Sequence, residues 1–193
     1  MNMRRPNFNR QRGDAVVAAI IAVLLFHVVG YVLMDLKRNV KEKRYYEAEA
    51  MGLLHMQNAL TEYARANQTA FKTGKTVMYV NNQLAPTITE LRSLGFLSQI
   101  GPEVTAPWGR TFATTLTVKG TGAIEGAVYL TGSIVDQSGN PDQPRACNVA
   151  KALGSIGLCT PPTNSAVLGN RTNQIPNPSG APAAVGALVF IAP

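Results

Sequence analysis

The side chains that could do chemistry in this sequence are few and widely separated. Cys147 and Cys159 are the only thiols, and the two histidines, His27 and His55, lie far from them in the sequence. A tetrahedral zinc site needs four nitrogen or sulfur ligands, so this pair of cysteines would leave it half empty. The acidic residues are spread along the chain without a close pair for acid–base catalysis. We therefore expect no metal, no cofactor and no enzymatic activity.

The sequence motifs of common enzymes are absent as well. Neither G-x-S-x-G nor H-E-x-x-H occurs in the chain. Residues 73–76, Thr-Gly-Lys-Thr, look like the end of a phosphate-binding loop, but Thr69 stands where that loop requires its first glycine. The sequence therefore does not predict a nucleotide site.

The net charge of +7 is concentrated at the N-terminus. Residues 1–13 contain four arginines and no acid, whereas residues 14–50 balance five bases against five acids. The later bases are scattered singly, and a surface that follows nucleic-acid phosphates needs a clustered stripe. We expect no nucleic-acid partner.

A membrane-spanning helix is predicted over residues 14–34. Residues 15–34 contain no charge, and twenty helical residues cover roughly the 30 Å of a bilayer's hydrocarbon core. A cleavable secretory signal would have a shorter apolar run, about 7 to 15 residues, ending in a small-x-small site. His27 has no second ionisable residue in the run, so we expect it to be tolerated beside a partner helix rather than to move protons.

The helix is expected to continue through residues 35–67. This part has no proline and many good helix formers. Its first half, residues 35–49, is polar nearly all round, and its second half carries an apolar stripe at helical spacing: Leu53, Met56, Leu60 and Tyr63. The sequence thus predicts a polar helical neck followed by an amphipathic spine that docks on a domain.

Residues 68–193 are predicted to form a small α+β domain. A capping box of Thr87 and Glu90 predicts a short helix that ends near Gly95. Three β-rich runs follow, at residues 112–120, 127–135 and 184–192, with a glycine-rich hairpin connection between the first two. Residues 160–183, rich in Pro, Asn, Gly and Ser, are predicted to be a surface loop.

The two cysteines are interpreted as a disulfide. An export signal and a loop-rich setting favour a bridge between Cys147 and Cys159 and hence an oxidising periplasm or exterior. The alternative is two unrelated buried thiols.

Four features occur in an order that resembles type IV pilins. A short basic leader ends in Gly13, an apolar segment follows at once, the helix continues as an amphipathic spine, and a strand-rich domain with two cysteines comes last. The stretches TITELRSLGFLS, PWGRTF and ACNVAKALGSIG look like the constant N-terminal region of the shufflon-type minor pilins of conjugative thin pili. The resemblance implies an α+β fold in which a long N-terminal helix packs on a small antiparallel sheet with short extra helices.

The resemblance also implies processing and assembly. Prepilin peptidase would cut between Gly13 and Asp14, and the N-terminal helix would then pack among other pilin subunits. Family members usually begin with Phe or Met, and major subunits carry Glu as the fifth mature residue; here these places hold Asp14 and Ala18. Because Ala18 cannot pair with a neighbour's α-amino group, we expect a minor subunit at the tip or at low copy number.

The expected role is adhesion or conjugative mating-pair contact, in a minor b-type pilin that binds a recipient-cell or surface receptor. The expected location is the inner membrane, with one span and a periplasmic C-terminal domain, and then the pilus. Charge does not decide the orientation of the span in the membrane, since four arginines precede the span and five bases follow it. The alternatives are an uncut bitopic inner-membrane protein with a periplasmic binding module and a secretion-system pseudopilin.

Overall fold

The computed structural model describes residues 8–98, 105–106, 110–136 and 138–193. The backbone is described throughout these ranges, and the side chains from residue 17 onward, apart from residues 105–106. The chain forms two compact units, Met1–Arg44 and Tyr45–Pro193. The described part of the first unit is a single helical segment, of which we call residues 17–44 the stem. We call the second unit the head.

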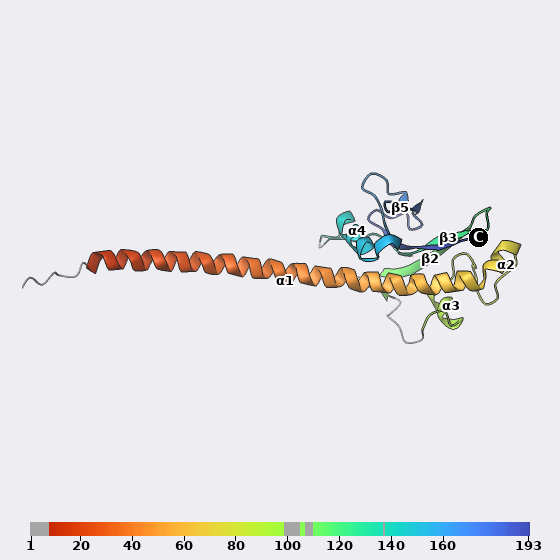
Figure 1. The fold of residues 1–193 in the computed structure, drawn as a ribbon, viewed down its shortest axis with the longest axis horizontal. Helices are drawn as coiled ribbons and strands as arrows, with labels where there is room; N and C mark the ends of the chain where they lie inside the picture. Colours follow the sequence, from red (N-terminus) through yellow and green to blue (C-terminus); the bar gives the residue numbers. More distant parts are fainter. Residues whose placement is uncertain (1–7, 99–104, 107–109, 137) are drawn as a thin grey trace, which may run out of the picture. The chain divides into compact units, whose positions relative to one another are not determined.

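Helix α1 runs from Phe8 to Ala66 (Figure 1). So long a helix can form because the sequence has no proline between these residues and only three glycines. The helix passes from the first unit into the second, and its residues Tyr45–Ala66, which we call the docked half, belong to the head. The prediction that one helix continues past residue 34 to about residue 67 is confirmed.

The docked half contributes the centre of the head's core. Leu53, Leu60 and Tyr63 are completely buried and Met56 is 4% exposed, so the predicted apolar stripe is confirmed. The ring of Tyr63 makes edge-to-face contacts with Phe71 and Phe96, at centroid distances of 5.9 and 5.6 Å. Its hydroxyl donates a hydrogen bond to a backbone carbonyl, which satisfies the one polar atom of this large buried side chain.

Two contacts fix the docked half on the sheet. Gly52 lies so close to Phe112 that a Cβ there would come within 2.9 Å of the ring's Cζ, so a side chain would require the ring to shift. Five residues further along, the Gln57 amide donates a hydrogen bond of 3.1 Å to the carbonyl of Leu188. These contacts join segments that are far apart in the sequence.

The head's sheet has seven antiparallel strands in the order β1-β2-β3-β7-β4-β5-β6. The strands are β1 (Thr105–Ala106), β2 (Arg110–Val118), β3 (Ile124–Leu130), β4 (Gly157–Cys159), β5 (Val167–Gly169), β6 (Gln174–Pro176) and β7 (Val185–Ile191). The last strand in the sequence, β7, therefore lies between β3 and β4. It joins the β2–β3 hairpin to the other half of the sheet.

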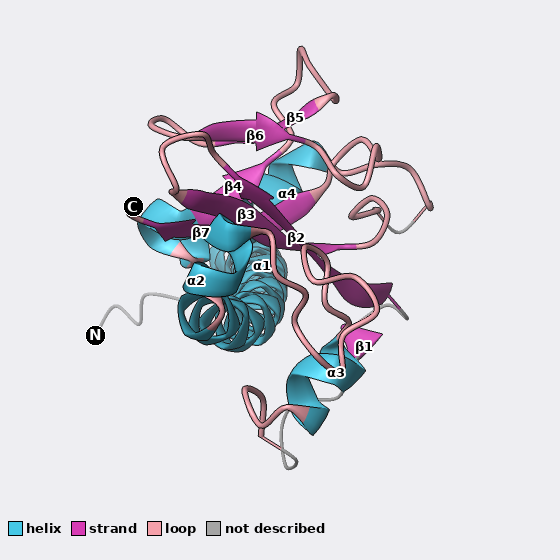
Figure 2. Cartoon of the chain, turned by 90° about the vertical axis from the view of Figure 1, so that its right-hand side faces the viewer, coloured by secondary structure: helices cyan, strands magenta, loops and turns pink. Residues whose placement is uncertain are grey.

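The two faces of the sheet are covered differently (Figure 2). The docked half and α4 (Gln143–Ala152) share one core with the face that carries Val128 and Ala187. On the other face, the β5–β6 hairpin curls over a second, smaller cluster that contains Leu158 and Leu188. This arrangement shows the expected α+β class, with a long N-terminal helix on an antiparallel sheet.

Three short helical elements complete the head: α2 (Gln68–Thr73), α3 (Ile88–Ser93) and the 3₁₀ turn η1 (Gly154–Ile156). α3 begins with the predicted capping box, in which the Glu90 backbone donates to the Thr87 hydroxyl and the Thr87 backbone donates to the Glu90 carboxylate. Gly95 follows α3 with a φ of +82°, a backbone conformation that glycine adopts without strain.

Two sequence-based predictions of the head were wrong in detail. β3 begins at Ile124 and ends at Leu130, not at residues 127 and 135. In the sequence, Gly126 looked like part of a turn, but it lies within β3. The strand needs a glycine there, because a side chain would overlap the carbonyl of Thr115 on the neighbouring strand. The segment 160–183 is not loop throughout, since it contains β5 and β6.

Candidate functional site

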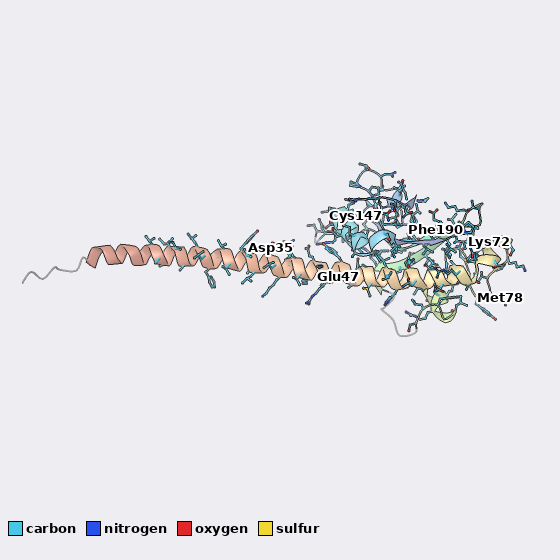
Figure 3. All side chains as sticks on the ribbon, in the orientation of Figure 1. Asp35, Glu47, Lys72, Met78, Cys147 and Phe190 are labelled. Atoms are coloured by element: carbon cyan, nitrogen blue, oxygen red, sulfur yellow. A yellow bond between two sulfur atoms is a disulfide. The ribbon has the colours of Figure 1, made fainter. Side chains whose placement is uncertain are left out.

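The most prominent surface of the molecule is the apolar part of the stem. Every large apolar side chain from Val17 to Met34 is at least 50% exposed. Figure 3 shows these side chains projecting from a single helix. A soluble monomer rarely exposes so large a continuous apolar surface, and its usual function is contact with lipid or with another protein. The helix is long and apolar enough to cross a membrane, in agreement with the predicted span.

Within the apolar run, His27 makes a local hydrogen bond. The Nδ1 atom of His27 lies 2.8 Å from the carbonyl of Val23 one turn earlier, a hydrogen bond in which the ring nitrogen donates. The imidazole therefore meets part of its hydrogen-bonding need without a second helix. Nothing in the described structure lies within 4 Å of a Cβ built at Gly30, so this glycine leaves an open notch in the helix surface.

The residues expected to govern processing and assembly lie at the start of the helix. Ala18 is exposed on the stem. Gly13 and Asp14 fall within the bounds of α1, but their side chains lie outside the described residues, as does most of the leader's backbone, residues 1–7. The roles of these residues in processing and assembly therefore stay predictions.

The two cysteines are joined in a disulfide, as expected. Cys147 lies on α4 and Cys159 ends β4, with Cα atoms 5.1 Å apart and a sequence separation of 12. Beside the bridge, the Gln143 amide donates to the carbonyl of Thr160 at 3.0 Å, and the buried Thr160 hydroxyl exchanges hydrogen bonds with the Ala184 backbone next to β7. The bridge therefore joins α4 to β4 at the sheet.

Glu49 is an unexpected polar group in the core. It lies on the docked half with only 1% of its surface exposed, and neither carboxylate oxygen has a hydrogen-bond partner in the described part of the chain. Burial raises the pKa of Glu49 to about 8, and the positive charge of Arg110 at the start of β2 partly opposes this increase. Burial in turn lowers the pKa of Arg110, and Glu49 raises it.

The sequence contained a signal for Glu49 that was missed. Glu49 precedes Leu53 by four residues and Met56 by seven, so it lies on the same helical stripe as the buried residues. We assigned it to the polar neck because its side chain is charged. The apolar periodicity, followed one turn backwards, would have placed it in the core.

The head also exposes single large apolar side chains. Met78 and Tyr79 are 70% and 80% exposed, and Phe190 on β7 is 59% exposed; Figure 3 shows Met78 and Phe190 at separate places on the head. Tyr79 has a φ of +66°, which is uncommon for a residue with a side chain. Separate apolar residues of this kind do not form a pocket.

A metal site would need several His, Cys, Asp or Glu side chains close together. Among the residues that the structure describes, no three of these side chains come together in this way. His55 is exposed on the docked half, and His27 lies in the other unit, on the stem.

Comparisons with protein-family models, with curated proteins and with solved structures gave no match in any of the three. The function therefore has to be inferred from the sequence and from the geometry described above.

Proposed function

We propose that this protein is a minor subunit of the type IV pilin class, of the b type, which serves as a structural or tip subunit of a pilus used in adhesion or mating-pair contact. The observation that carries the proposal is the continuity of α1. Its exposed apolar part leads without a break into the docked half, which forms the centre of a disulfide-bonded α+β head. One helix could therefore hold the head first at a membrane and later at a fibre.

The physical basis of this role is the apolar surface of the stem. In a bilayer, an apolar helix gains little by leaving lipid for other apolar helices unless the packing is close. Such a helix can therefore stay in the membrane as a monomer and move sideways into a bundle of related helices. No covalent chemistry is needed, and we propose no catalytic role, cofactor or nucleic-acid partner for this chain.

The proposed location follows from the same elements. The stem would cross the inner membrane once, with the head on the periplasmic side, where an oxidising environment maintains the Cys147–Cys159 bridge. The subunit would reach the cell surface as part of the pilus. Its partners would be other pilin subunits, prepilin peptidase and a receptor on a recipient cell or surface.

Ala18 determines the proposed position in the fibre. In a bundle, the α-amino group of a newly added subunit is buried among apolar helices, where an unpaired charge is costly. A carboxylate at the fifth mature position of a neighbouring subunit can pair with this α-amino group, but Ala18 has no carboxylate. A subunit without this carboxylate fits the tip, where it does not have to pair with the α-amino group of a neighbouring subunit.

The test of processing is the intact mass of the protein from membranes and from sheared fibres. In cells with an active prepilin peptidase, we expect a chain that begins at Asp14, and we expect Gly13→Leu to abolish this product. Gly30→Leu is the matched control, because it places the same side chain at a glycine away from the cut and should leave processing intact. Recovery of only full-length chain from the unmodified protein would contradict the proposal.

The test of position is immunogold labelling of fibres. Label confined to fibre ends would support a tip subunit, whereas continuous label along the shaft would contradict it.

One observation favours a second candidate. Asp14 stands at the position where pilins usually begin with Phe or Met. If the peptidase does not accept it, the chain is an uncut bitopic protein that holds a periplasmic binding module. Full-length chain in membranes and its absence from fibres would support this candidate. A pseudopilin would instead be cut and found with a secretion system.

A further inference from the structure

A tight turn on the head presents two large apolar side chains to solvent. Met78 and Tyr79 are the two residues of this turn, and they are 70% and 80% exposed. Tyr79 has a φ of +66°, a conformation that turns usually assign to glycine or asparagine, so the backbone there is strained. Figure 3 shows Lys72 and Met78 at the same end of the head. A strained, exposed aromatic residue of this kind indicates a binding surface.

Hydrogen bonds fix the turn on the head from both sides. Before the turn, the Val77 backbone donates to the side-chain oxygen of Gln83 at 2.9 Å, and the Val77 side chain is buried. After the turn, the Asn81 backbone donates to the Glu90 carboxylate at 2.7 Å, and the carbonyl of Gln83 accepts from the buried Tyr63 hydroxyl at 3.0 Å. The turn is thus ordered by the head itself, and a partner does not have to supply the free energy of ordering it.

The charges around the turn are positive on balance. Residues 69–85 contain Lys72 and Lys75 and no acid, and both lysines are exposed. Within the part of the chain that the structure describes, neither lysine has an ion-pair partner. Glu90 approaches this segment at Asn81 and offsets one of the two positive charges. The surface therefore favours an anionic partner.

The apolar area of the turn is small for a protein partner. A specific protein interface covers about 800 Å² on each side, whereas one aromatic side chain buries about 150 to 250 Å². The flanking residues add little, because Val77 is buried and Val80 is partly buried against the core. A lipid surface has no such minimum area, since each apolar side chain that enters it gains free energy separately.

The residue types match the surface layers of a bilayer. Tyrosine is enriched at the headgroup level, where both its ring and its hydroxyl are solvated, and methionine is a flexible apolar side chain suited to acyl chains. Lys75 precedes Met78 by three residues, so their Cα atoms lie at most about 11 Å apart. A lysine side chain at this distance reaches the headgroup layer, which is about 5 to 8 Å thick, when the turn lies at the edge of the hydrocarbon core.

We propose that the Met78–Tyr79 turn inserts into the surface of an anionic lipid membrane that the head meets outside the cell. Met78 enters the outer part of the acyl chains, Tyr79 lies at the headgroup level, and Lys72 and Lys75 contact lipid phosphates. The inference goes beyond the proposed function, which leaves the contacted surface unidentified. It rests on that function in one respect, because the head meets such a membrane only if it lies outside the cell.

The test is the binding of lipid vesicles by the full chain. The chain is reconstituted through its stem into phosphatidylcholine nanodiscs on beads. Fluorescent vesicles are then added, made of phosphatidylcholine alone or of equal parts phosphatidylcholine and phosphatidylglycerol. We expect the mixed vesicles to bind more tightly than the neutral ones. Met78→Ser should weaken the binding by about tenfold or more, as expected for the burial of one methionine side chain.

Tyr79→Gly separates binding from folding. Glycine adopts a positive φ without strain, so this variant removes the ring and keeps the turn. We expect it to lose vesicle binding, whereas the guanidinium midpoint of the head stays the same or rises. The matched control is Phe190→Ser, which removes an exposed aromatic ring from another place on the head and should keep the binding.

The lysines are tested by Lys72→Gln/Lys75→Gln. Each basic side chain near an anionic surface contributes about fivefold to affinity, so this variant should lose up to about 25-fold on mixed vesicles and nothing on neutral ones. The control Lys151→Gln/Arg171→Gln removes the same charge from α4 and from the β5–β6 connection and should keep the preference. About 1 M sodium chloride, where the screening length is about 3 Å, should weaken the preference of the unmodified chain.

Three results would overturn the inference. If the unmodified chain binds neither kind of vesicle, the turn does not contact lipid and a protein is the better candidate. If Tyr79→Gly binds as well as the unmodified chain, or loses no more than Phe190→Ser, the contact lies elsewhere. Equal losses in the two charge variants would show that the two lysines do not form the contact.

The inference and the proposed function fail in different ways. If the chain does not enter nanodiscs, the membrane proposal for the stem is refuted. The same vesicle assay on the full chain held in a non-ionic amphipol then decides whether the turn binds lipid.

Discussion

Replacing Glu49 by Gln should make the stability of the head less dependent on pH. In the unfolded chain this carboxyl titrates near its ordinary value of 4.5, whereas burial raises its pKa in the head to about 8. Between these values the unfolded state has lost a proton that the folded state keeps. The free energy of unfolding of the unmodified protein should therefore fall as pH rises through this window, and level off above it.

The structure sets the size of this effect. The two pKa values are about 3.5 pH units apart, and each unit corresponds to 1.36 kcal/mol, so the full loss is about 5 kcal/mol. At pH 7 the unfolding free energy has fallen by about 3 kcal/mol, by the same conversion. Glu49→Gln keeps the shape of the side chain and removes the titration. The stability of this variant relative to the unmodified protein should thus increase from pH 5 to pH 9.

The assay is guanidinium unfolding of the full chain in detergent, followed by near-ultraviolet circular dichroism of the head's aromatic side chains. The control is Glu62→Gln on the same helix, because Glu62 is largely exposed and pairs only with Arg65 at the surface in the described structure. We expect the control to keep the pH dependence of the unmodified protein. Parallel curves for the unmodified protein and Glu49→Gln across this range would refute the reasoning.

Three further outcomes are expected. Alkylation of the unreduced, unfolded protein should find no free thiol. Cys159→Ser leaves Cys147 unpaired and should lower the free energy of unfolding, measured by denaturant titration, by about 3 kcal/mol for a loop of this length. Gly157→Ala should prevent the head from folding, seen as lost dispersion in the amide spectrum, because its Cβ would overlap the carbonyl of Ala150. Thr87→Ala should cost about 1 kcal/mol by removing the capping box, whereas Thr87→Ser should restore most of it.

Patterns that depend on local chemistry predicted much of the fold. The absence of proline and the apolar stripe predicted α1, and a capping box predicted the start of α3 at the right residue. The same holds for the β-rich run at the end of the sequence, which became β7. These elements carry their signal within a few residues, because helix caps and side-chain periodicity are local properties.

Features that depend on contacts between distant segments were not predictable in the same way. Gly126 has the appearance of a turn residue, and only the approach of β2 explains why a strand needs glycine there. The strands β5 and β6 have three residues each, too few to show an alternating pattern. The burial of Glu49 depends on which elements cover that turn of α1. For the proposed site, the sequence indicated the apolar stem and the disulfide, whereas the proposed cut after Gly13 stays a prediction.

The central position of β7 has a consequence for the order of events during synthesis. Among the strands that the structure describes, β3 and β4 both pair with β7 and not with each other, so β7 joins the two halves of the sheet. Residues 185–191 leave the ribosome after the other elements described above. Until then, the β2–β3 hairpin and the cysteine-containing half have no shared hydrogen bonds, and much of the core that faces the docked half stays open. The head can thus complete its fold only after translation of β7, and a ribosome that stalls earlier releases a chain with two unjoined sheet edges.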